Sequence, residues 1–186
     1  MKLWLVRHPP VLLEAGHCYG ALDLAADLEA SRQCALALAA VLPQQAHVSS
    51  SPLQRCEQLA QVLIGLRPDL TLSIDARLRE MDFGFWEGRR WADISRKEFD
   101  AWMADFGAHA VGGQGDSVNA LMDRVAQAYD ELQRTPEPAP DQVWVTHAGV
   151  IRATDLLAQG LRTLARADQW PVDGVACGQW RTLTLK

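Results

Sequence analysis

Short apolar runs alternate with longer amphipathic stretches along the chain. The runs have the length and the alternating or β-branched character of strands, and they cover residues 2–6, 46–49, 70–74, 143–146 and 180–185. Apolar positions recur at helical spacing in the stretches between them, over residues 28–42, 51–65, 117–134 and 149–159. The pattern therefore predicts strands that alternate with helices.

Proline and glycine mark the breaks in this pattern. Pro43 ends the helix predicted over residues 28–42. Ser51 followed by Pro52 predicts the start of the next helix, because serine caps a free backbone N–H and proline in the first turn loses no hydrogen bond. The proline-rich residues 136–140 predict a connector, and residues 82–115, which mix glycine with aromatic side chains, predict loops with short helices.

Strands that alternate with helices predict an α/β fold, a three-layer α/β/α sandwich with a mainly parallel central sheet. The length of 186 residues predicts a single domain over 1–186. A hydrophobic share of 48% and a charged share of 22% exclude a disordered or fibrous chain.

The charge and the cysteines narrow the classes of partner. A net charge of −5 without a basic run predicts no binding to nucleic acid or to anionic membranes. No apolar stretch approaches the roughly 18 residues of a membrane helix, and Arg7 comes too early for a signal peptide, so we expect a cytoplasmic protein. The four cysteines are too dispersed for a metal knuckle or a disulfide scaffold.

Basic side chains follow three of the predicted strands. Arg7 and His8 follow the first strand, Arg55 comes shortly after the second, and His147 follows residues 143–146. Because ligands bind beyond the carboxyl ends of parallel strands, we expect these four side chains to converge on one rim. Two histidines and two arginines suit a phosphate dianion.

The same residues can also do chemistry. A neutral imidazole can attack phosphorus, while the second histidine and both guanidinium groups offset the charge on the equatorial oxygens. Glu80 lies in an apolar and aromatic stretch after the third strand and is the candidate proton donor to the leaving oxygen. We expect a bell-shaped pH dependence, because the nucleophile must be neutral while the acid keeps its proton.

In combination these motifs resemble the histidine phosphatase superfamily, from residue 2 to the helix after His147. The segments that carry the resemblance are Arg7-His8, Ser50-Ser51-Pro52-Leu53-x-Arg55, Leu78-x-Glu80, Phe83-Gly84, Trp86-Glu87 and Thr146-His147-Ala148-Gly149. Cys18-Tyr19-Gly20 and residues 80–88 are most similar to the α-ribazole phosphatase branch of cobalamin synthesis.

The resemblance implies a phosphomonoesterase that needs no metal or cofactor. In it His8 becomes a phosphohistidine, Arg7, Arg55 and His147 hold the phosphoryl group, and Glu80 is the acid and base. The implied substrate is a small-molecule phosphomonoester, α-ribazole 5′-phosphate. A broad-specificity phosphatase, a phosphoglycerate-type mutase and a non-catalytic binder of phosphorylated ligands remain as alternatives.

The resemblance also suggests a substrate wall, formed by Tyr19, Gly20, Phe83, Trp86 and Ala148. Aromatic residues at this spacing can instead fill a core, and this alternative stays open for Trp86, Trp91 and Trp102. The chain departs from the family after His8, where Pro9 replaces the usual glycine and residues 11–14 lack the usual hydroxyl and amide. We expect a rigid loop in which the Pro9 carbonyl orients the imidazole, and the phosphate contacts of this loop stay open.

Overall fold

Alternating apolar side chains build one five-stranded sheet at the centre of the molecule. The computed structural model describes residues 1–185. The strands are β1 (Lys2–Arg7), β2 (His47–Ser50), β3 (Thr71–Ile74), β4 (Gln142–Thr146) and β5 (Trp180–Thr184), in the order β3-β2-β4-β1-β5. The first four strands are parallel to one another, and β5 runs antiparallel to β1 at the edge.

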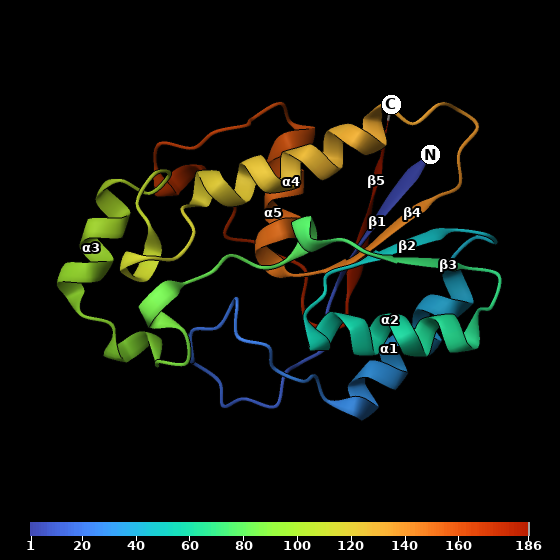
Figure 1. Cartoon of the computed structure of the whole chain (residues 1–186), viewed down its shortest axis with the longest axis horizontal. Helices are drawn as coiled ribbons and strands as arrows, with labels where there is room; N and C mark the ends of the chain where they lie inside the picture. The colour runs from blue at the N-terminus through green and yellow to red at the C-terminus, as the bar shows by residue number, and fades with distance from the viewer. Residues whose placement is uncertain (186) are drawn as a thin grey trace.

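Helices cover both faces of the sheet, so the predicted three-layer α/β/α sandwich is confirmed (Figure 1). One face packs against α1 (Leu28–Val41) and α2 (Gln54–Leu66), and the other against α4 (Val118–Gln133) and α5 (Ala148–Ala158). The alternation along β1 places Leu5 and Val6 in opposite layers of the core. Residues 1–185 contain no helix that is both long and apolar enough to cross a membrane.

The helix boundaries agree with the capping signals except in α2. Asp27 and Ser117 accept hydrogen bonds from backbone N–H groups in the first turns of α1 and α4. The prediction that Ser51 begins the second helix is wrong, because α2 starts at Gln54 after Leu53. The Gln54 backbone N–H donates to the Asp23 carboxylate at 2.7 Å, so a distant residue caps this helix. The Ser51 hydroxyl instead accepts a hydrogen bond from His147 at 2.8 Å, a contact that the local sequence does not indicate.

Residues 82–116 form a lobe beyond the end of the sheet, at the left of Figure 1. As predicted, the lobe consists of loops and short helices, namely α3 (Arg96–Ala104) and the 3-10 helices Gly84–Trp86, Trp91–Asp93 and Val111–Gly113. Two further 3-10 helices, Ala76–Leu78 and Ala167–Gln169, lie outside it. Gly112 has φ 59°, and a Cβ there would overlap the Phe83 carbonyl oxygen, so two loops of the lobe meet without side chains between them.

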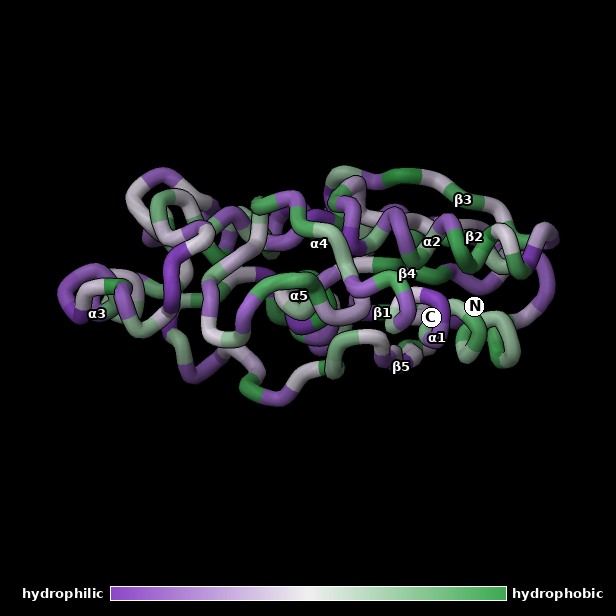
Figure 2. The backbone as a smooth tube through the Cα atoms, turned by 90° about the horizontal axis from the view of Figure 1, so that it is seen from below, coloured by the Kyte–Doolittle hydropathy of each residue, from purple (hydrophilic) through white to green (hydrophobic). Residues whose placement is uncertain are grey.

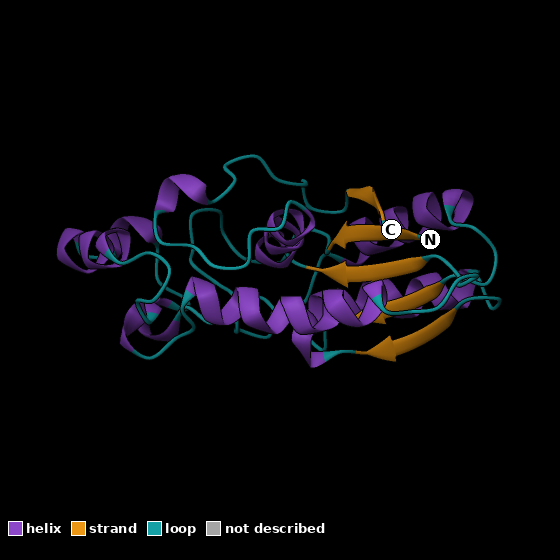
Figure 3. Ribbon diagram, turned by 90° about the horizontal axis from the view of Figure 1, so that it is seen from above, coloured by secondary structure: helices purple, strands orange, loops and turns teal. Residues whose placement is uncertain are grey.

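The topology opens a crevice at the carboxyl ends of the strands. The arrowheads of the parallel strands point toward the lobe (Figure 3), and much of β4 is coloured hydrophobic (Figure 2). The chain leaves β1 toward α1 on one face and leaves the neighbouring β4 for α5 on the other face. Because the two connections diverge, ligands have access between these strand ends.

Candidate active site

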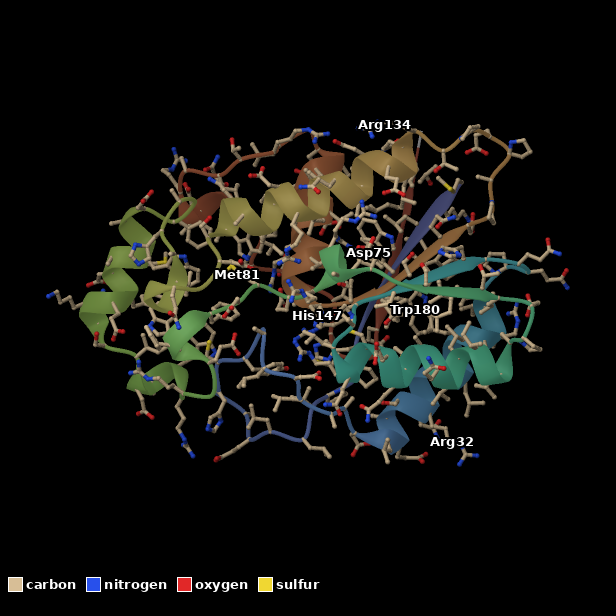
Figure 4. All side chains as sticks on the ribbon, in the orientation of Figure 1. Arg32, Asp75, Met81, Arg134, His147 and Trp180 are labelled. Atoms are coloured by element: carbon tan, nitrogen blue, oxygen red, sulfur yellow. The ribbon has the colours of Figure 1, made fainter. Side chains whose placement is uncertain are left out.

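The ends of β1 and β4 place three of the predicted residues side by side. Arg7 is paired with Thr146 at the end of the ladder, and the His8 backbone N–H donates to the Thr146 carbonyl at 2.9 Å. His147 directly follows Thr146 and precedes the first turn of α5. The imidazole centroids of His8 and His147 are 5.1 Å apart. Nitrogen-bearing side chains gather around His147 between the sheet and the lobe (Figure 4).

His8 is held in one orientation and one tautomer. Its Nδ1 lies 2.7 Å from the Pro9 carbonyl oxygen, as the sequence predicts, and since a carbonyl only accepts, Nδ1 carries the proton and Nε2 keeps its lone pair. The side chain is 2% exposed. Burial, followed by the charges of Arg55 and Arg7, lowers the pKa of His8 to about 3. His8 is therefore a neutral imidazole throughout the neutral and mildly acidic pH range.

Arg55 and His147 form a buried pair next to His8. The Arg55 guanidinium donates to the carbonyls of Gly20 at 2.6 Å and Leu22 at 2.7 Å, and its Nε donates to His147 Nδ1 at 3.3 Å. His147 Nδ1 is thus an acceptor, so its Nε2 carries the proton that it donates to Ser51. Burial, with the charge of Arg55 next in size, holds the pKa of His147 well below its ordinary value.

The loop that contains Tyr19 and Gly20 forms another wall of the crevice. The Tyr19 ring lies edge-on to His8 with centroids 6.5 Å apart, and the central carbon of the Arg55 guanidinium lies 5.4 Å from the Tyr19 ring centroid. Glu87 accepts hydrogen bonds from the backbone N–H groups of Gly20, Ala21 and Leu22 at 3.0, 2.9 and 3.1 Å. Glu87 thereby fixes the carbonyls that hold Arg55, which gives the Trp86-Glu87 motif a structural role.

Glu80 faces the N-terminus of α5. The Thr146 hydroxyl donates to the Leu78 carbonyl at 2.7 Å, and Arg124 donates to the Arg79 carbonyl at 2.7 Å, so the backbone before Glu80 is tied to β4 and α4. The Glu80 carboxylate accepts from the backbone N–H groups of Met81 and Gly149, both at 3.0 Å. A Cβ at position 149 would overlap Glu80 Oε1, so this approach requires glycine.

A pocket of about 100 Å³ lies beside Glu80. Phe83 and Ala148, both predicted as wall residues, line it together with Met81, Trp102, Phe106, Val118, Leu121, Gly149, Arg152 and Trp170. The sequence pattern did not indicate a place in the site for Arg152, or that the Ser51 hydroxyl would contact His147. Arg152 comes four residues after Ala148 on α5, and this spacing alone would have placed both on one face of the helix.

The prediction that Trp86 contacts the substrate is wrong for this structure. Its side chain is 1% exposed and does not line the pocket. The indole packs edge-on against Trp91 and Trp102, with ring centroids 6.3 and 5.7 Å away, and its N–H donates to Glu98 at 3.3 Å. Trp86 therefore belongs to the core of the lobe, which is the alternative that its spacing had left open.

These groups have the properties that phosphoryl transfer through nitrogen requires. His8 offers a neutral imidazole with a free lone pair on Nε2. Two guanidinium groups and a second imidazole surround it, and a carboxyl group stands next to them at the edge of the pocket. Nucleophile, positive charge and proton donor are thus close to one another.

Comparisons with known proteins agree with this chemistry. Residues 3–177 match the family described as histidine phosphatase superfamily (branch 1). The chain is 34% identical over 185 residues to the glucosyl-3-phosphoglycerate phosphatase of Mycolicibacterium vanbaalenii, covering 93% of this chain and 79% of that protein. It is 28% identical over 159 residues to the adenosylcobalamin/alpha-ribazole phosphatase of Escherichia coli, covering 81% and 75%.

A solved structure of a mycobacterial glucosyl-3-phosphoglycerate phosphatase superposes with a TM-score of 0.79 at 25% identity, over 97% of this chain and 88% of that one. The alignment thus includes nearly the whole chain. The chain therefore belongs to the histidine phosphatase superfamily, branch 1, and is a phosphatase.

Proposed function

We propose that the protein hydrolyses small-molecule phosphomonoesters through a phosphohistidine at His8. The observation that carries the proposal is the bond between His8 Nδ1 and the Pro9 carbonyl, because it leaves the Nε2 lone pair free beside two guanidinium groups. Arg7, Arg55 and His147 bind the phosphoryl oxygens in this proposal, and Glu80 is the acid and base.

In the first step, His8 Nε2 forms a bond to phosphorus as the bond from phosphorus to the ester oxygen breaks. Glu80 gives its proton to that oxygen, and the alcohol leaves. The positive charges of Arg7 and Arg55 stabilise the equatorial oxygens in the transition state. His147, which is neutral in the free enzyme, adds hydrogen bonding to the same oxygens once its ring leaves Ser51.

In the second step, water attacks phosphorus and the bond to Nε2 breaks. Glu80, now a carboxylate, takes the proton from this water, so inorganic phosphate is released and both His8 and Glu80 return to their starting states. Glu80 lines the pocket, so in this proposal the alcohol departs into this space and the attacking water comes from it.

We further propose α-ribazole 5′-phosphate as a substrate. Its flat benzimidazole ring needs an apolar wall near the phosphate, and Phe83, Trp102, Phe106 and Trp170 supply aromatic side chains at the pocket beside Glu80. The resemblance of residues 80–88 to the α-ribazole phosphatase branch supports the same choice. Tyr19, edge-on to His8, offers a second aromatic surface.

A phosphorylated organic acid is the second candidate substrate. Relatives named as glucosyl-3-phosphoglycerate phosphatases are among the similar proteins, and one cationic side chain, Arg152, lines the otherwise mostly apolar pocket. A panel of phosphomonoesters compared by kcat/KM, including α-ribazole 5′-phosphate, glycerol 3-phosphate and 3-phosphoglycerate, ranks these candidates. Similar values for all of them would favour a broad-specificity phosphatase.

The phosphohistidine is tested by trapping it. After rapid mixing with a ³²P-labelled substrate and quenching in detergent, the protein should carry label that acid removes and alkali leaves in place, and the label should map to His8. His8→Ala should lose the label and at least about 10⁴-fold in turnover. His109→Gln, in the lobe, is the matched control and should keep both. Turnover in His8→Ala at the wild-type rate, or complete loss of wild-type activity with a chelator, contradicts the proposal.

A further inference from the structure

Two hydrogen-bond donors at the pocket beside Glu80 have no acceptor among residues 1–185. They are Arg152 Nε and Trp102 Nε1, both of which are shielded from solvent. Arg152 comes from α5 and Trp102 from α3 of the lobe, so residues of two separate elements with such donors line one pocket. A buried donor without an acceptor is unfavourable, so the pair indicates that a ligand completes the pocket.

The guanidinium of Arg152 is only weakly tied to the protein. Its Nη2 lies 3.4 Å from the Val172 carbonyl oxygen, and a Cβ at Gly174 would come within 3.0 Å of the same nitrogen, so backbone covers one side of the group. Burial lowers the pKa of Arg152, with Glu80 acting in the opposite direction. The Glu80 carboxylate, the one acidic group at this pocket, already accepts from two backbone N–H groups. Among residues 1–185, the positive charge of Arg152 thus has no dedicated counterion.

The two donors without acceptors define the chemistry of the ligand that would complete this pocket. Both orphan groups donate, and one is charged, so the complementary group accepts hydrogen bonds and carries a negative charge. A hydroxyl would leave the desolvated guanidinium without a counter-charge. The pocket of about 100 Å³ also holds Phe83 and other apolar side chains, so it suits a small anion attached to a carbon skeleton.

We propose that Arg152 and Trp102 form a carboxylate-binding site, which makes the enzyme prefer phosphomonoesters whose alcohol portion carries a carboxylate. The inference rests on the proposed phosphatase function and deepens it, because it favours the second candidate substrate, a phosphorylated organic acid, over α-ribazole 5′-phosphate, which carries no carboxylate. Glu80 lies at the edge of the same pocket, so the group that departs from phosphorus enters this space. The carboxylate is held beyond Glu80, while Arg7, Arg55 and His147 around His8 hold the phosphate.

Two matched substrate pairs test the proposal. 3-Phosphoglycerate and glycerol 3-phosphate differ only by a carboxylate in place of a hydroxymethyl group, and 4-carboxybenzyl phosphate and benzyl phosphate extend the comparison to a longer, flat skeleton. In the wild type, the carboxylate member of at least one pair should have a kcat/KM higher by about tenfold or more. Equal values within both pairs would overturn the carboxylate site.

Variants test whether Arg152 and Trp102 cause the preference for a carboxylate. Arg152→Met, which keeps the length of the side chain but removes the charge, should abolish the preference while the neutral member stays within about threefold of wild type. Arg152→Lys should retain part of it, and Trp102→Phe, which removes only the N–H, should reduce it by about threefold. Arg96→Met, on the exposed face of α3, should leave every ratio unchanged.

The outcomes separate this inference from the proposed function. If the wild type hydrolyses neither member of any pair, and no other phosphomonoester, the phosphatase function itself fails. If both members are hydrolysed and Arg152→Met slows them equally, Arg152 acts on the phosphate or on the fold, and the carboxylate site is wrong. Circular dichroism and thermal unfolding check each variant. If Arg152→Met does not fold, the wild-type ratios and Trp102→Phe decide the question.

Discussion

The two ends of the active site are built in different ways. At the phosphate end, His8, Arg55 and His147 are at most 2% exposed, and neighbouring backbone or side-chain groups orient each of them. At the leaving-group end, the pocket beside Glu80 is assembled from separate stretches of chain, and two of its donors have no acceptor among the described residues. The contrast teaches that the nucleophile His8 is oriented before substrate arrives, whereas selectivity belongs to an incomplete pocket. Arg7 Nε, at the phosphate end, also has no acceptor among the described residues, as expected of a group that binds phosphate.

Glu80 lies between the phosphate end and the leaving-group end, and its substitution should have the largest effect on the leaving-group step. Glu80→Gln should lower kcat/KM for an alkyl phosphate by about 10³-fold, because the departing alkoxide loses its proton donor, but by only about tenfold for p-nitrophenyl phosphate. Steady-state kinetics on both substrates measure the split. Equal losses on the two substrates would show that Glu80 does not act as the acid.

Trp86 tests whether the lobe's aromatic core and the pocket wall are distinct. Trp86→Ala should lower the free energy of unfolding by about 4 kcal/mol, because a fully buried indole is removed. It should leave unchanged the ratio of KM for an aromatic phosphate to KM for glycerol 3-phosphate. Phe83→Ala, which alters the wall itself, should raise that ratio. Urea unfolding and kinetics give the two readouts, and a shifted ratio with unchanged stability would return Trp86 to the wall.

The buried imidazole at the phosphate end should make the fold sensitive to acid. The pKa of His8 is about 3 in the folded protein against 6.5 as its ordinary value, so below about pH 6.5 the unfolded chain binds a proton that the native state does not. The contribution of His8 to the free energy of unfolding is therefore complete above pH 6.5 and is lost as the pH falls toward 3. At pH 4 the loss is about 3 kcal/mol. His147 adds to the loss in the same direction.

Urea unfolding at pH 7 and pH 4 measures this effect. His8→Asn, whose amide can still donate to the Pro9 carbonyl, should lose less stability between the two pH values than the wild type. Identical losses would mean that His8 is not the group that titrates. The low pKa also implies that protonation of His8 does not limit kcat/KM above about pH 4.

Substitution of Gly149, which lies against Glu80, should have a smaller effect on kcat/KM. Gly149→Ala should displace the Glu80 carboxylate, which a Cβ would overlap, and lower kcat/KM for alkyl phosphates by about 30-fold with little change in melting temperature. Gly65→Ala, in α2 with open space around it, is the matched control and should be neutral or slightly stabilising. Wild-type activity in Gly149→Ala would show that the position of Glu80 tolerates this shift.

The strand pattern and the motifs predicted most of the phosphate end. Arg7, His8 and His147 each lie within one residue of a strand end, and in a parallel sheet that position alone brings them to one rim. The role of the Pro9 carbonyl could also be predicted from the local sequence, because Pro9 directly follows His8, whose ring it orients. Ser51 was misassigned because its partner, His147, is 96 residues away, and local capping rules cannot see such a contact.

The leaving-group end was harder to predict because tertiary packing decides it. Trp86 and Trp102 lie in the same aromatic stretch, but only Trp102 reaches the pocket, and no period in the sequence distinguishes them. Arg152, the cation of this pocket, lies within an ordinary helix, where no motif marks it. Its position on the pocket side of α5 follows from its spacing to Ala148, but its lack of an acceptor follows only from the folded structure.

The bond from His8 to Pro9 also determines regiochemistry. An imidazole has two nitrogens that can carry phosphate, and the Pro9 carbonyl occupies Nδ1, the π nitrogen, throughout. The covalent intermediate is therefore expected as a single positional isomer, τ-phosphohistidine, with no π isomer beside it. Isomer-specific antibodies or phosphorus NMR of the trapped protein distinguish the two, so the choice of nitrogen can be read directly from the product of the first half-reaction.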